Sequence, residues 1–145
     1  MVTAVSENQA TVHPARLASQ RSVAAVQAKD KAAWLALWAE DGCVEDPVGV
    51  SFIDPVGDGF RGPDRLEEFW DKNIGPTDSI VFALHDSFAA GSEVANVATI
   101  TITVGGNTVT KCEGVFVYRV DDDGKLLSLR AFWETERMLA TLAQV

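Results

Sequence analysis

The sequence predicts an α+β fold in which three N-terminal helices pack on the concave face of a strongly curved, mainly antiparallel sheet. Two observations support this fold class. Segments of helical composition are confined to the first half of the chain, whereas the second half consists almost entirely of strand-like segments separated by short turns. A length of 145 residues is that of one domain. We therefore expect a single domain over residues 14–145, preceded by a polar, flexible tail over residues 1–13.

Three segments in the first half of the chain are predicted to be helical. The first spans residues 15–28, where small and apolar side chains share one broad face. Asp30 is a good N-cap for a second, shorter helix rich in tryptophan and leucine, and residues 41–42 (Asp-Gly) are expected to end that helix. Asp64 and Glu67 form a plausible capping pair for the third helix.

The predicted strands are residues 43–45, 80–88, 93–104, 108–120 and 126–133. Alternation is clearest in the third of these, because alanine, isoleucine and valine side chains share one face and threonines share the other. Between the second and third helices, the glycine-rich residues 49–62 are predicted to form a long loop with apolar side chains. Such a loop can cover a site as a lid.

Composition excludes several classes of function. A net charge of −9 argues against nucleic acid and against anionic membrane surfaces, because both attract basic patches. No apolar run approaches the length of a membrane span, and the first ten residues lack the features of a secretory signal. Cys43 and Cys112 are too few for a disulfide framework and lack zinc-ligand spacing, so we expect buried thiols and a cytoplasmic location. No phosphate-binding loop or ligand cluster suggests a cofactor or a metal.

Asp46 is the principal candidate for chemistry. It lies in the segment Val44–Gly49, between a short apolar strand and Pro47, which biases the preceding residue toward extended backbone. A carboxylate at the end of a strand and beside an apolar interior is suited to proton transfer. An aspartate before proline can also serve only to start a turn.

The segments around Asp46 resemble the ketosteroid isomerase branch of the NTF2-like (SnoaL-like) superfamily. The matching segments are Ala39–Gly42 and Val44–Gly49, Arg61-Gly62 before a helix, and Ser128–Trp133 after a Gly-Lys hairpin. The order and spacing of the elements agree from about residue 14 to residue 137. The resemblance implies a cone-shaped fold, a homodimer, and an apolar small-molecule ligand such as a 3-oxo steroid. It also implies that Asp46 is the general base of a proton transfer.

The same resemblance indicates that the usual oxyanion donors are absent. In the isomerases a tyrosine and a protonated aspartic acid stabilise the dienolate oxygen. The tyrosine position falls on Ser22, and the acid position falls on Phe116, or on Gly114 if the following hairpin carries two extra residues. Phenylalanine and glycine cannot donate a proton from a side chain. The candidate substitute donors are Tyr118, Ser22, His85 and the indole N–H of Trp133.

An aromatic-lined pocket is expected around Asp46, and its predicted lining is Ser22, Phe60, Phe69, Gly114, Phe116, Tyr118 and Trp133. Three functions are compatible with such a pocket. The first is cofactor-free proton transfer on a bulky apolar carbonyl compound, and the second is non-catalytic binding of steroid-like ligands. The third is a cyclase, dehydratase or hydrolase reaction. Epoxide hydrolysis would need an Asp/Arg/Asp cluster around a water molecule, for which the candidate arginines are Arg61, Arg65 and Arg130.

Overall fold

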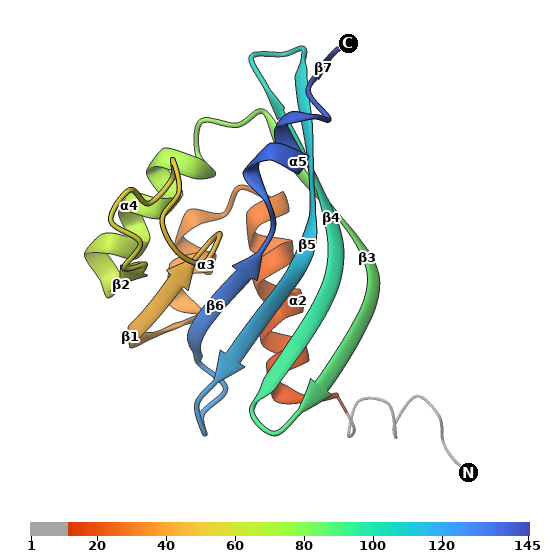
Figure 1. Cartoon of the computed structure of the whole chain (residues 1–145). Coiled ribbons are helices and arrows are strands. Elements are labelled where there is room, and N and C mark those ends of the chain that lie inside the picture. Colours follow the sequence, from red (N-terminus) through yellow and green to blue (C-terminus); the bar gives the residue numbers. More distant parts are fainter. Residues whose placement is uncertain (1–11) are drawn as a thin grey trace.

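A computed structural model describes residues 12–145, and its centre is a curved, unclosed sheet (Figure 1). The strand order is β2-β1-β6-β5-β4-β3, with β7 paired to β5. All neighbours are antiparallel except β1 and β6, which are parallel. The fold class predicted from the sequence is therefore confirmed. The strands are β1 (Trp38–Glu45), β2 (Phe60–Arg61), β3 (Ser79–Ala90), β4 (Glu93–Val104), β5 (Thr108–Val120), β6 (Leu126–Phe132) and β7 (Ala143–Gln144).

The helices cover one side of this sheet. Helix α2 lies inside its curve against β3, β4 and β5, and α4 packs on β1 and β2 (Figure 1). The helices are α2 (Pro14–Gln27), α3 (Lys31–Ala36), α4 (Pro63–Asn73) and α5 (Thr135–Leu139). No helix within residues 12–145 is long and apolar enough to cross a bilayer. Most of the tail predicted over residues 1–13 lies outside the residues that the structure describes.

Helix α3 begins where the sequence predicted but ends earlier. The Asp30 side chain accepts a hydrogen bond from the Ala33 N–H at 3.1 Å, as expected of an N-cap. The prediction that residues 41–42 end this helix is wrong, because the chain has already entered β1 at Trp38. There the register pairs Trp38 with Leu126 of β6, so sheet pairing replaces helical hydrogen bonds.

The start of α4 also differs from the prediction. Its N-cap is Gly62, which has a φ of 87° and no side chain, and Pro63 occupies the first helical position. Asp64 and Glu67 therefore do not cap this helix. Glu67 instead forms an ion pair of 2.8 Å with Lys31 of α3.

The strands of the second half agree closely with the alternation read from the sequence. Strands β4 and β5 have the predicted bounds, and β3 is slightly longer, with a bulge between Leu84 and Asp86. Helix α5 and strand β7 are absent from the prediction. Both are short, and α5 buries none of its residues, so it leaves little apolar periodicity in the sequence.

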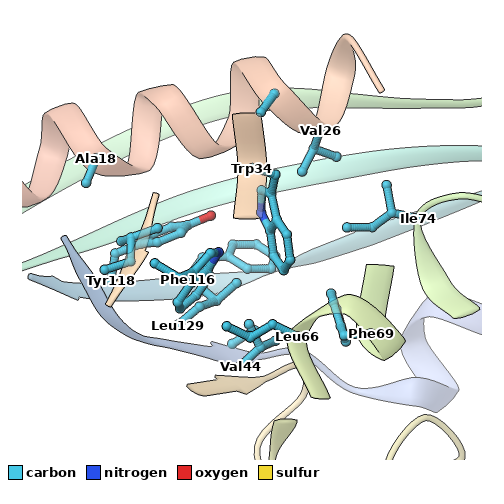
Figure 2. Packing of buried hydrophobic residues seen from close by; sticks show 14 of the residues in the cluster. Ala18, Val26, Trp34, Val44, Leu66, Phe69, Ile74, Phe116, Tyr118 and Leu129 are labelled. Atoms are coloured by element: carbon cyan, nitrogen blue, oxygen red, sulfur yellow. The ribbon is translucent and has the colours of Figure 1, made fainter. Parts of the chain in front are cut away.

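The core between helices and sheet is rich in aromatic side chains (Figure 2). Trp34 lies at its centre and is 2% exposed, with the Trp38, Trp70 and Phe69 rings at centroid distances of 5.3, 5.5 and 6.2 Å. These rings fill the interior beside α3 and α4. The interior between α2 and the middle strands is not filled in the same way, and it contains the cavity described next.

Candidate active site

A cavity of about 350 Å³ lies between the helices and the inner face of the sheet. Its size is within the range of small-molecule pockets. Most of its lining is apolar, including Phe116 of β5 and isoleucines of β3 and β4. A few polar groups interrupt this wall, among them the Asp46 carboxylate and the Ser22 and Tyr118 hydroxyls. Exposed residues such as Phe52 and Lys72 stand at the rim, so the cavity communicates with solvent.

Asp46 follows the last residue of β1, and pairing with β6 on both sides of it sets its position in the cavity. Strand β1 runs parallel to β6 as far as Glu45, and the Asp46–Pro47 peptide bond that follows is cis. The Val48 N–H then donates to the Ala131 carbonyl at 2.9 Å, which keeps the segment against β6. Glu45 points to the opposite face, where it pairs with Arg130 at 2.8 Å. One residue later, Asp46 is half-buried and lines the cavity.

The Asp46 carboxylate is held by one indole. Trp133, which follows β6, donates its Nε1–H to Asp46 Oδ1 at 2.5 Å. Burial raises the pKa of Asp46 from its ordinary value of 3.8 to about 6, and the Trp133 hydrogen bond moderates this rise. Burial also raises the pKa of the neighbouring Cys112 thiol to about 12, with a smaller contribution from the charge of Asp46. A carboxyl group with a pKa near neutrality is suited to accept and return a proton.

The backbone that carries Trp133 packs closely against Gly114 of β5. A Cβ atom added at Gly114 of β5 would collide with the Phe132 carbonyl oxygen and approach the Trp133 Cβ to 3.0 Å. A side chain at position 114 would therefore displace the backbone that carries the indole. Gly114 does not line the cavity, contrary to the sequence prediction, because Trp133 occupies the space in front of it.

Two hydroxyl groups, those of Ser22 and Tyr118, line the cavity. Burial strongly raises the pKa of Tyr118, as does the charge of Asp46, whereas the hydrogen bond with Ser22 lowers it. The Tyr118 hydroxyl is therefore protonated at neutral pH and can donate. The Trp34 indole N–H donates to Ser22 Oγ at 3.2 Å, which fixes that hydroxyl in the interior. Figure 2 shows the Tyr118 hydroxyl directed toward Trp34 beneath α2.

The structure thus brings together six of the predicted site residues and separates two. Those that line the cavity are Asp46, Ser22, Phe69, Phe116, Tyr118 and Trp133. Phe60, like Gly114, lies outside the lining, contrary to expectation. It packs edge-on against Phe69 at 5.3 Å, and the Arg65 guanidinium covers its other side at 4.4 Å.

Two candidate polar residues lie away from the cavity. His85 is exposed and its Nε2 contacts Thr99 Oγ1 at 2.7 Å, so it cannot serve as an oxyanion donor inside the cavity. Among the residues that the structure describes, the one side-chain hydrogen bond to Asp46 comes from Trp133, and no arginine joins it. The Asp/Arg/Asp arrangement needed for epoxide hydrolysis is therefore not formed around Asp46.

Several lining residues were not singled out from the sequence. Ile100 and Ile102 line the cavity, and their alternation in β4 already placed them on one face. Cys112 has the same parity as Phe116 and Tyr118 and could have been found in that way. Met138 belongs to α5, which the sequence did not predict. Within residues 12–145, no group of three or more His, Cys, Asp or Glu side chains is arranged to hold a metal ion.

Comparison with known proteins identifies relatives of this chain. The SnoaL-like domain family matches residues 19–129. A steroid Delta-isomerase from Nocardioides simplex is 31% identical over 131 residues, which cover 88% of this chain and 96% of the relative. The structure of a Delta 5-3-ketosteroid isomerase from a Mycobacterium species is 36% identical, with a TM-score of 0.82 over 92% of this chain and 100% of that one.

Other solved structures with this fold differ in what they bind or do. A Mycobacterium tuberculosis protein in complex with estradiol-17beta-hemisuccinate is 31% identical, with a TM-score of 0.81 over 90% of this chain and 98% of that one. An epoxide hydrolase-like structure from the same organism is 21% identical, with a TM-score of 0.72 over 88% of each chain. At that identity the second likeness shows the fold alone.

Proposed function

The chain belongs to the SnoaL-like (NTF2-like) domain family, and on that premise we propose that it is a cofactor-free isomerase that transfers a proton on a steroid-like carbonyl compound. The observation that carries the proposal is the environment of Asp46. Its carboxyl group combines a pKa of about 6 with a fixed hydrogen bond from Trp133 and a position in an apolar cavity of about 350 Å³. A carboxyl group that ionises just below neutral pH beside an apolar wall is suited to act as a general base on a carbon acid.

The proposed reaction is the movement of a double bond into conjugation with a ketone. The Asp46 carboxylate takes a proton from the carbon between the carbonyl group and the double bond. The C–H electron pair then forms a dienolate, with negative charge on the former carbonyl oxygen. Protonated Asp46 returns the proton to the far carbon of the original double bond. The electrons flow back, the enone is released, and the carboxylate is restored.

Tyr118 is the proposed donor to the dienolate oxygen. It lines the same cavity as Asp46, and its raised pKa keeps the hydroxyl protonated while the base ionises. Ser22, whose hydroxyl is fixed by the Trp34 indole, lowers the pKa of Tyr118 and so favours donation from its hydroxyl. Tyr118 would thus take over the donor role of the usual tyrosine and aspartic acid from a different position of the fold, supported by Ser22 at the position of the usual tyrosine.

The test is turnover of a 3-oxo steroid with a double bond between C5 and C6, followed by the absorbance of the conjugated enone. We expect turnover by the wild-type protein and its loss in Asp46→Asn, whereas Asp58→Asn, at an exposed position of the same loop, should retain full activity. Tyr118→Phe should lower kcat by about 100-fold, as loss of one oxyanion donor does elsewhere. Unchanged kcat in Tyr118→Phe would exclude Tyr118 as that donor.

A second candidate function is binding of steroid-like ligands without catalysis. It is favoured by the loss of the usual donors at Ser22 and Phe116, and by the steroid bound to the Mycobacterium tuberculosis relative. Submicromolar binding of 3-oxo steroids with no chemical change after long incubation would support this alternative. A cyclase, dehydratase or hydrolase reaction ranks third because no arginine joins Asp46 among the described residues.

We also propose that the protein is a cytoplasmic homodimer that pairs through the outer face of its sheet. Val81, Phe88 and Phe132 expose large apolar side chains there, beside the threonines of β4. An apolar outer face is typical of an interface. Light scattering should give a dimer mass, and Phe88→Asp should shift it to that of a monomer.

The cytoplasmic location is supported by the two buried free thiols, and cell fractionation tests it.

A further inference from the structure

A second cavity, which we call the side groove, lies between α2 and strands β3–β5. It has a volume of about 300 Å³. Phe82, Phe116 and Tyr118 line both this groove and the Asp46 cavity, so these three rings separate the two spaces. Neither Asp46 nor Trp133 reaches the groove. The groove therefore lacks the proposed base and the indole that holds it, although Tyr118 belongs to both spaces.

A closed ring of hydrogen bonds forms the polar end of the side groove. Arg16 Nε donates to Ser87 Oγ at 3.0 Å, and Ser87 Oγ donates to Asn96 Oδ1 at 2.7 Å. Asn96 Nδ2 donates to Ser19 Oγ at 3.1 Å, and Ser19 Oγ donates to the Arg16 carbonyl at 2.8 Å. Ser19 and Asn96 are 1% and 7% exposed, so this ring is fixed in the interior. It holds the Arg16 side chain in one orientation.

Arg16 retains hydrogen-bonding capacity within this arrangement. A guanidinium has five N–H donors, and the structure shows two of them used, by Ser87 Oγ and the Ser87 carbonyl. The ion pairs formed among residues 12–145 do not include Arg16. Of the described residues, it is the only charged one that lines the groove, in a chain whose net charge is −9. A fixed, half-buried guanidinium with spare donors is suited to an oxyanion.

Most of the remaining wall of the side groove is apolar, although Gln20 and Gln27 of α2 also line it. Phe82, Leu84 and Ala98 face α2 from the sheet, and Val23 and Ala24 face them from the helix. Leu84 is 56% exposed although it lies on the inner face of β3. The groove thus presents a single cation and, beside it, a largely apolar surface. That pattern complements an amphiphilic molecule that carries a single negative charge.

We propose that the side groove is a second ligand-binding site, which takes a monoanionic amphiphile with a carboxylate, sulfate or sulfonate group. The anionic oxygens accept hydrogen bonds from Arg16, whose position is set by Ser87. The apolar body of the ligand lies along Phe82 and Leu84. The site is separate from the Asp46 cavity, and its occupant need not be the substrate of any reaction there.

The proposal is tested with two fluorescent probes of nearly identical shape. The first is 1-anilinonaphthalene-8-sulfonate, which carries one negative charge, and the second is the uncharged N-phenyl-1-naphthylamine. Titration of the full chain should give saturable binding of the sulfonate. Arg16→Gln should weaken this binding about 10- to 100-fold, as expected for loss of a charged hydrogen bond, and leave the affinity for the uncharged probe unchanged.

Two further variants of α2 separate the side groove from general charge effects. Arg21→Gln removes the same charge from an exposed position that does not line the groove, and it should change sulfonate affinity less than twofold. Ala24→Trp places an indole in the groove from its exposed edge and should abolish sulfonate binding. Equal weakening by Arg16→Gln and Arg21→Gln, full binding by Ala24→Trp, or no saturable binding by the wild-type protein would each overturn the proposal.

Discussion

Replacing Asp46 by asparagine should make the folded protein more stable at neutral pH. In the folded state, burial raises the pKa of Asp46 to about 6 from an ordinary value of 3.8, which is the value expected in the unfolded chain. Two pKa units correspond to about 3 kcal/mol. The ionised carboxylate therefore lowers the free energy of unfolding by about that amount, and asparagine removes this cost because it cannot ionise.

The free energy of unfolding of the wild-type protein should fall as the pH rises. Because the folded-state pKa is the higher one, the folded state binds more protons than the unfolded state between about pH 4 and pH 6. The wild-type protein therefore loses stability as the pH rises through that window, and the full cost is present above pH 6. Asp46→Asn should be about 3 kcal/mol more stable than wild type at pH 8, and the difference should fall below about 1 kcal/mol at pH 4.

Urea unfolding at pH 8 and pH 4 measures both differences. In the Asp46→Asn variant the amide oxygen can still accept the Trp133 hydrogen bond, so the substitution changes charge with little change in packing. Asp58→Asn is the matched control, since it removes a carboxylate from an exposed position and should alter stability by less than about 0.5 kcal/mol. An Asp46→Asn protein no more stable than wild type at pH 8 would refute the reasoning.

Two further predictions concern the residues that hold Asp46. Trp133→Phe removes the hydrogen bond that lowers the pKa of Asp46. Titration followed by carboxyl NMR should therefore show that the pKa of Asp46 rises by about one unit. An unchanged pKa would show that the indole does not stabilise the carboxylate. Gly114→Ala should destabilise the protein by about 1–3 kcal/mol, because the added Cβ collides with the Phe132 carbonyl oxygen. Gly75→Ala is the control, since its Cβ would meet its nearest neighbour at 3.5 Å, and equal effects of the two substitutions would contradict the account.

The fold was predictable where the sequence carries a strong periodic signal. Strands β4 and β5 were predicted with their observed bounds because alternation and glycine turns mark them clearly. The end of α3 was not predictable in this way. Large apolar residues continue from the last turn of α3 through Leu37 to Trp38 at the start of β1, and long-range pairing with β6 decides where the helix stops. That residues 14–145 form one domain stays a prediction.

The site was predictable to the extent that strand parity and motif spacing determine it. Asp46, Phe116 and Tyr118 share the cavity, and spacing alone placed the last two on one face. Spacing could not show that the Trp133 indole bonds to Asp46 rather than pointing to a ligand, because that contact depends on how closely β5 and β6 approach at Gly114. Nor could it exclude Phe60, which is apolar, close to the site, and hidden behind Phe69.

The central claim is that the ionised carboxylate of Asp46 accepts the proton from the substrate and then returns it. The pH dependence of kcat/KM for a 3-oxo steroid with a C5–C6 double bond tests it most directly, because this quantity reports the ionisation of the free enzyme. We predict that kcat/KM rises with pH through a single apparent pKa of about 6 and is constant above it. A rise centred near pH 4, or no turnover at any pH by a protein that binds the steroid, would contradict the claim.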